Sequence, residues 1–285
     1  MGVDGIAGTA AELVRPRSVP RPLRPWVPRV ARAGLAAKAA VYLTLGLVAA
    51  RAAAGWGGRP TDTRGAVEEM GRRGGMAVAA LVGLGLLCYA AWRFVQGIAD
   101  VDNEGSSWTG LIARVSHVVS GIGHLLLGLT ALGLAVGIHA RRHGARWTAR
   151  LLAAPEGALI LGVVGVVVIV VGAVQFVQAY RDNFLKHVNT QRMSRPALAW
   201  LRRLGRFGHA ARGVTFWVIG YLMVQAARHT DPHEARGVAG ALRFVRAQEN
   251  GDVLLGVAAA GVIAYGAFEL MMIWHRRLDA GPRAA

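Results

Sequence analysis

The chain has 285 residues, of which 54% are hydrophobic and only 17% are charged. Globular domains carry about a quarter charged residues, so this composition excludes an ordinary soluble protein if the apolar residues are clustered. They are clustered, because Ala158 to Val174 contains no charged or strongly polar side chain and similar blocks recur between charged stretches. A helix of about 20 apolar residues crosses the hydrocarbon core, so the sequence predicts an all-α, polytopic transmembrane bundle.

The net charge of +17 is compatible with binding to nucleic acid or to anionic lipid. The basic residues lie between the apolar runs, which is the pattern of loops that bind anionic headgroups on the cytoplasmic side of a bilayer. We therefore expect lipid headgroups and no nucleic acid as partners, and we leave open a membrane-protein partner and the oligomeric state. Cys88, the single cysteine, lies in an apolar run, where packing is its default role.

Residues 1–30 contain five prolines and several arginines but no long apolar run, and we expect them to form a disordered basic tail. Six candidate spans follow, at residues 33–54, 76–98, 114–138, 157–179, 209–227 and 252–274. Lys and Arg are more frequent on the side of the two termini and of the loops near 100–113 and 180–208, which places both termini in the cytoplasm. The predominance of arginine over lysine suggests a GC-rich bacterial genome, so the expected location is the bacterial plasma (inner) membrane.

The spans recur as three pairs. Residues 32–47 read RAGLAAKAAVYLTLGL and residues 206–221 read RFGHAARGVTFWVIGY, with five of the sixteen positions identical. A degenerate copy begins at Arg114. A glycine opens the second span of each copy, namely Gly75, Gly157 and Gly251. The offset is 82 residues from the first copy to the second and 174 to 176 from the first to the third, which indicates a true repeat.

Each copy holds two spans, so all copies enter the membrane from the same side, and the sequence predicts three parallel two-helix hairpins around a pseudo-threefold axis. The division of the chain is a tail at 1–30, hairpin repeats at 31–98, 112–180 and 205–277, a basic linker at 181–204 and a C-terminal tail at 278–285. Before the last span, residues 231–234 read DPHE, a helix-start signal, and the apolar positions after them favour a helix lying on the membrane surface.

The third copy carries small and basic residues at fixed spacing: Arg206, Gly208, Ala210, Ala211, Arg212, Gly213, Phe216 and Gly220. GALR follows at residues 240–243 and GDVLL at residues 251–255. This pattern resembles the family catalogued as domain of unknown function 1206, over about residues 30–277. The resemblance implies a bacterial integral membrane protein with several copies, usually three, of a two-span unit, and it implies no activity. The first copy departs from the pattern at Ala39, and the second has Ser120 in place of the cation.

Charged residues also fall inside the spans. Lys38 and Arg212 are equivalent and lie about one turn inside the cytoplasmic boundary, because the apolar intervals after them are too short to cross the core. Arg93, Gln175 and Glu269 are equivalent positions in the second spans. Either the cations extend to the headgroups, or they face the interior, where Glu269 would need Arg212 or Lys38 as partner. The second interpretation predicts a polar cluster of Lys38, Arg93, Ser120, Gln175, Arg212 and Glu269.

His117 and His209 are equivalent positions on separate helices, as a b-type haem requires, so a haem-binding electron-transfer subunit is the alternative function. The histidine pairs in loops 139–143 and 229–233 are spaced like metal ligands, but solvated side chains are the simpler interpretation. The sequence contains no nucleophile, nucleotide or metalloenzyme motif, and we expect no enzymatic activity, cofactor or metal. The leading interpretation is a structural or interaction subunit, or a small pore-like or carrier-like bundle.

Overall fold

The computed structural model describes residues 26–138, 144–235 and 237–277. These residues form helices and contain no strand beyond one isolated bridge between Val188 and Arg276. The elements in chain order are α2 (Val27–Ala53), α3 (Thr63–Ala99), α4 (Trp108–Ala135), α5 (Gly144–Leu152), α6 (Gly157–Arg181), η2 (Asn183–His187), η3 (Thr190–Arg192), α7 (Arg195–His229), α8 (Val238–Arg246) and α9 (Gly251–His275). The C-terminal tail, the histidine pair of loop 139–143 and most of the N-terminal tail lie outside the described residues.

Several helices begin earlier than the predicted spans, and α2 and α7 extend into the segments predicted as the N-terminal tail and the linker. α2 begins at Val27 with a proline in its first turn, so the last residues assigned to the tail are helical. α7 begins at Arg195, where Ser194 Oγ accepts a hydrogen bond from the backbone N–H of Ala197 at 3.4 Å. Much of the segment expected as the linker 181–204 is therefore the first part of α7.

Each repeat places a short helix before its second span. In the first repeat this is the segment 63–74 of α3, separated from the span by Gly75, whose φ of 74° suits glycine. In the other repeats it is α5 and α8, which cover equivalent positions. The helix start expected at Asp231 is wrong, because its carboxylate accepts a hydrogen bond from the backbone N–H of His233 at 2.8 Å within a turn. α8 begins only after Gly237.

Five helices are long and apolar enough to cross a membrane: α2, α3, α4, α6 and α9. α7 is not among them, although it contains 35 residues. His209, Arg212 and Gln225 interrupt its apolar sequence. The described residues therefore support a multi-pass membrane protein, while the sixth span remains a prediction.

The helices contact one another in a cyclic order. α3 packs on α4, α6 on α7 and α9 on α2, so the second span of each repeat contacts the first span of the next. The crossings lie at positions related by the repeat offsets: Gly128 against the carbonyl oxygen of Gly83, Gly220 against that of Gly165, and Gly46 against that of Ala259. Small residues at such crossings let two backbones approach closely. Three equivalent crossings agree with the expected pseudo-threefold bundle.

The hairpins of the first and third repeats are closed by small residues. The closing contacts are Gly34 with Tyr89 and Ala37 with Gly85 in the first repeat, and Gly208 with Tyr265 and Ala211 with Gly261 in the third. The hairpin of the second repeat differs, because α4 and α6 do not pack along each other in the described residues. The equivalent positions there are Ser116, Val119, Val167 and Val171, which are all exposed. Branched side chains in place of glycine and alanine oppose close approach of the two backbones.

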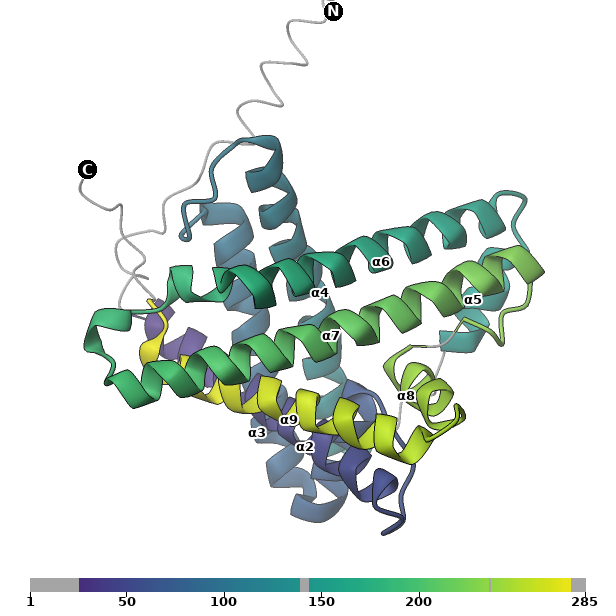
Figure 1. Cartoon of the computed structure of the whole chain (residues 1–285), viewed down its shortest axis with the longest axis horizontal. Helices are drawn as coiled ribbons and strands as arrows, with labels where there is room; N and C mark the ends of the chain where they lie inside the picture. The colour runs from purple at the N-terminus through teal and green to yellow at the C-terminus, as the bar shows by residue number, and fades with distance from the viewer. Residues whose placement is uncertain (1–25, 139–143, 236, 278–285) are drawn as a thin grey trace, which may run out of the picture.

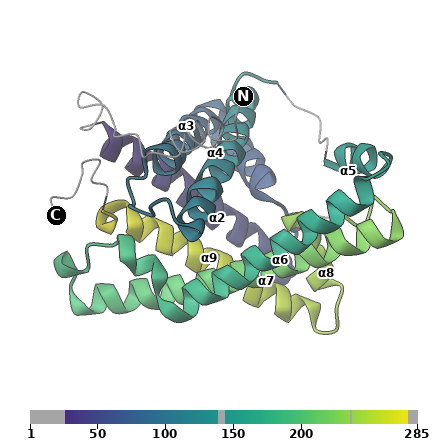
Figure 2. The same cartoon turned by 90° about the horizontal axis from the view of Figure 1, so that it is seen from above.

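Figures 1 and 2 show the resulting shape. α3 and α4 run side by side as one pair, α6 and α7 run side by side as another, and the two pairs cross at a steep angle. α2 and α9 connect the pairs through their contact with each other and with α3 and α7.

Candidate functional site

Lys38 of α2 lies in the interior of the bundle. Its Nζ donates to Oε1 of Glu269 at 2.6 Å and to the hydroxyl oxygens of Tyr89 at 2.9 Å and Tyr265 at 3.0 Å. Lys38 is 7% exposed and Glu269 is 5% exposed. An ammonium group has three donors, so these three acceptors satisfy it inside the protein. The side chain therefore does not extend to the headgroups.

Arg212 of α7 reaches the same group of side chains. Its Nη1 donates to the hydroxyl oxygen of Tyr265 at 2.5 Å, and its guanidinium carbon lies 4.4 Å from the centroid of that ring. The same carbon lies 5.3 Å from the ring of Phe216 and 5.7 Å from the ring of Tyr42. Aromatic faces stabilise a desolvated cation but carry no net charge. Among the described residues, no carboxylate lies within ion-pair distance of Arg212.

The two other polar positions in the first and second repeats lie beside the ion pair without joining it. Arg93 lies with its guanidinium carbon 5.9 Å from the ring of Tyr89 and donates to Gln96 at 3.2 Å. Ser120 of α4 lies 3.5 Å from the ring nitrogen Nδ1 of His124. Neither adds a negative charge, so the interior holds more cations than carboxylates.

Side chains from α4 and α6 flank this group. His124 of α4 lies edge-on to Tyr89, with ring centroids 4.5 Å apart. Oε1 of Gln175 in α6 lies 2.7 Å from Nδ1 of His209, and the His209 ring lies 5.4 Å from that of Tyr265. All three repeats therefore contribute to one polar centre.

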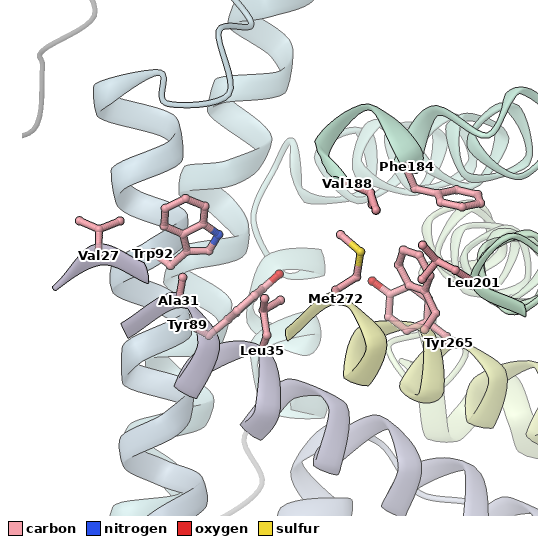
Figure 3. Close-up of a cluster of buried hydrophobic side chains, with 11 residues drawn as sticks. Val27, Ala31, Leu35, Tyr89, Trp92, Phe184, Val188, Leu201, Tyr265 and Met272 are labelled. Carbon is pink, nitrogen blue, oxygen red and sulfur yellow. The ribbon is translucent and has the colours of Figure 1, made fainter. Parts of the chain in front are cut away.

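Sequence analysis missed the two tyrosines that connect these charges. Tyr89 and Tyr265 are equivalent positions, offset by 176 residues like the glycines that open the spans. In Figure 3 the two side chains approach from opposite sides of a buried apolar cluster, with Leu35 and Met272 between them. The constant offset between repeats could have identified these two tyrosines as an equivalent pair. The second repeat has Val171 at this position, so it contributes no hydroxyl.

The two histidines proposed as haem ligands have different surroundings. His209 is hydrogen-bonded to Gln175 and stacked on Phe184, with ring centroids 5.3 Å apart. His117 instead has both of its ring nitrogens buried without a hydrogen-bond partner in the described part of the chain. Nothing in this geometry supports a shared haem.

A second polar group joins the loops at the end of the bundle that was predicted to be cytoplasmic. Asp102 accepts hydrogen bonds from Gln96 at 2.5 Å and Arg276 at 3.3 Å, and Nδ1 of His187 lies 3.5 Å from it. Burial opposes ionisation of Asp102, but the charges of Arg276 and His187 outweigh burial and lower its pKa. Because these residues come from segments next to all three repeats, the group acts as a junction between them.

The arginines that begin the second and third copies also join neighbouring repeats. Arg114 donates to the carbonyl oxygen of Gly97, near the C-terminus of α3, at 2.9 Å. Arg206 donates twice at 2.8 Å to Asp182, which directly follows α6. A cation near the C-terminus of a helix is favourable, so this position of the motif holds successive repeats together.

Fold and site define an all-helical protein of three two-helix repeats, with five helices able to cross a membrane and one buried charge cluster. The family model described as Domain of Unknown Function (DUF1206) matches three times in tandem, at residues 33–100, 115–182 and 207–274. The chain belongs to this family, which confirms the resemblance seen in the sequence. It is similar to the uncharacterized protein YxxB of Bacillus subtilis (strain 168), with 31% identity over 261 residues that cover 89% of this chain and 94% of the relative. No solved structure matches.

Proposed function

We propose that the protein is a non-enzymatic, multi-pass protein of the bacterial inner membrane, with both termini in the cytoplasm, that binds an anion in the interior of its helical bundle. A small carrier or pore needs such a site, and the basic loops bind anionic headgroups around it. The observation that carries the proposal is the imbalance of charge at this centre: Lys38, which is buried, and Arg212, which is half-buried, lie at a single carboxylate, Glu269.

The imbalance is informative because a charge without a partner is unfavourable in a medium that lacks water. Lys38 is satisfied by its three acceptors, whereas Arg212 is only half-buried and makes its hydrogen bond through Nη1. The guanidinium has five N–H donors, so several remain for an anionic ligand. The hydroxyl groups of Tyr89 and Tyr265 lie at the same centre, each within hydrogen-bond distance of Lys38 Nζ.

A purely structural role requires much less than this cluster. The crossings at Gly83, Gly165 and Gly220 bring the helices together by close backbone packing, without any charge. Ionisable residues inside a membrane bundle instead mark solute pathways and binding sites. We therefore favour the carrier-like or pore-like function over the structural subunit.

The test introduces a thiol beside the cluster while keeping every charge. Ser120→Cys, in a Cys88→Ser background, places it at the α4 position equivalent to Lys38 and Arg212. In membrane vesicles we expect a negatively charged methanethiosulfonate reagent to modify it faster, relative to the cationic reagent, than it modifies a flexible surface thiol. Arg212→Gln should reduce this preference by about tenfold, the effect of losing one charged hydrogen bond.

Val170→Cys on α6 is the matched control, because Val170 is 56% exposed on the outer surface of the bundle. If Ser120→Cys reacts no faster than Val170→Cys, or shows no preference for the anionic reagent, the interior is closed to anions and the proposal is wrong.

A further inference from the structure

We propose that the anion bound at this centre is the headgroup of a single-chain anionic amphiphile, which reaches the cluster from the bilayer through the open side of the second repeat, between α4 and α6. This inference rests on the proposed anion site and specifies its ligand: a carboxylate or phosphate group on an apolar chain.

The first argument is the position of the opening. Five of the six neighbouring helix pairs expected in a closed ring pack along each other in the described residues, and α4 and α6 are the pair that does not. The cluster lies inside this ring, bounded by His124 of α4 and by Gln175 of α6 through its contact with His209. On the side next to these two residues, no close packing between helices closes the bundle.

The second argument is the chemistry of the exposed helix faces. The side of α6 that would meet α4 carries Val164, Val167, Val171 and Val174, with exposures between 41% and 54%. In α4 the position of Gly123 is open, whereas Val41 at the equivalent position of α2 is 1% exposed. An apolar surface of this kind suits an acyl chain and offers nothing to a small hydrated anion.

The third argument is the position of the cations. The cations lie behind the opening, and the second repeat itself contributes only the uncharged Ser120 and Gln175 at the equivalent positions. Arg212 has no carboxylate partner in the described chain and is half-buried. An amphiphile with its chain on the valine face and its headgroup at Arg212 satisfies both the apolar surface and the unmatched charge.

The experiment uses the full-length protein in phosphatidylcholine vesicles. The probe is a palmitic acid analogue with a photoactivatable group in its chain, and the comparison probe is the corresponding alcohol, which has the same chain and no charge. After illumination, labelled peptides are located by mass spectrometry. We expect the acid to label α4 around Val119 and α6 around Val167 and Val171 several-fold more than the alcohol does.

Arg212→Gln should reduce labelling of these peptides by the acid about tenfold and leave labelling by the alcohol unchanged. Arg203→Gln is the matched control, because Arg203 is an exposed arginine on the same helix, and it should have no effect. Arg212→Lys keeps the charge and should retain most of the labelling, which separates loss of the ligand contact from loss of folding.

Equal labelling of α4 and α6 by acid and alcohol, or labelling that is insensitive to Arg212→Gln, would overturn lateral access by an amphiphile. If Ser120→Cys still prefers the anionic reagent in that case, the anion site stands and its ligand is a soluble anion. If that preference is also absent, the proposed function is wrong as well.

Discussion

Removing the carboxylate of Glu269 from the polar centre should destabilise the protein more than removing the lysine that pairs with it. Nζ of Lys38 and Oε1 of Glu269 are 2.6 Å apart, which corresponds to an attraction of about 6 kcal/mol at an effective dielectric constant of about 20. Desolvation offsets much of this, but breaking a buried pair by removing one partner costs about 3–5 kcal/mol. Glu269→Gln leaves Lys38 and Arg212 together without a carboxylate, so we expect a loss at the upper end of that range.

Lys38→Met should be milder, because Arg212 already donates to Tyr265 beside Glu269 and can take over the carboxylate. We expect a loss of about 1–3 kcal/mol, the range for a hydrogen bond to a charged group. The double variant Lys38→Met, Glu269→Gln should recover part of the loss caused by Glu269→Gln alone, since it restores the original net charge of the centre. Reversible unfolding in mixed micelles, followed by tryptophan fluorescence, measures all three. A larger loss for Lys38→Met than for Glu269→Gln would refute the arrangement of charges.

Three further predictions test the packing, the junction and the topology. Gly208→Val should cost about 1–3 kcal/mol, since a side chain there meets the backbone of Tyr265, while Gly123→Val has free space and should unfold at the same temperature as the wild type. Asp102 has a lowered pKa, so its stabilising contribution is complete above its unfolded pKa of about 3.9 and is lost as the pH falls further. Between pH 6 and pH 3 (about the range that brackets this value) the wild type should therefore lose more thermal stability than Asp102→Asn, and equal losses would exclude the junction. Reporter fusions should place both ends of the chain in the cytoplasm, and opposite locations would contradict an even number of spans.

Much of the fold could be predicted because it follows from composition and periodicity. Apolar runs of bilayer length, separated by arginine-rich loops, predicted helices that cross a membrane, and the constant offsets between copies predicted three repeats. The same offsets placed Lys38, Arg212 and Glu269 at one depth, where Lys38 and Arg212 were the two partners considered for Glu269. The choice between them could not be made from the sequence, because it depends on how α9 packs on α2 and α7.

Two features differ from the sequence-based prediction. One is the start of the helix predicted at residue 231, and the other is the packing of the second hairpin. Asp231 has the composition of a helix cap, but its side chain closes a local turn, and tertiary packing of α8 decides where that helix starts. The second hairpin was predicted as one of three parallel hairpins, although its sequence is a degenerate copy of the motif. The sequence of the second hairpin differs at the contact positions: it has Val119 and Val171 where the first repeat has Ala37 and Tyr89.

The loss of charge and the loss of packing occur in the same repeat, and this coincidence has a physical consequence. Three copies identical to the third, which has Arg212 and Glu269, would bring three cations and three carboxylates to one axis, where a balanced group of ion pairs has no need for a ligand. The second copy instead has Ser120, Val171 and Gln175 at the positions that hold Lys38, Tyr89 and Arg93 in the first copy. It contributes neither a charge nor a hydroxyl of tyrosine to the centre, and its helices do not pack across the opening. The divergent second repeat, together with Arg93 of the first copy at the position of Glu269, leaves a centre with a single ion pair, an excess of cations among the described residues and one open side.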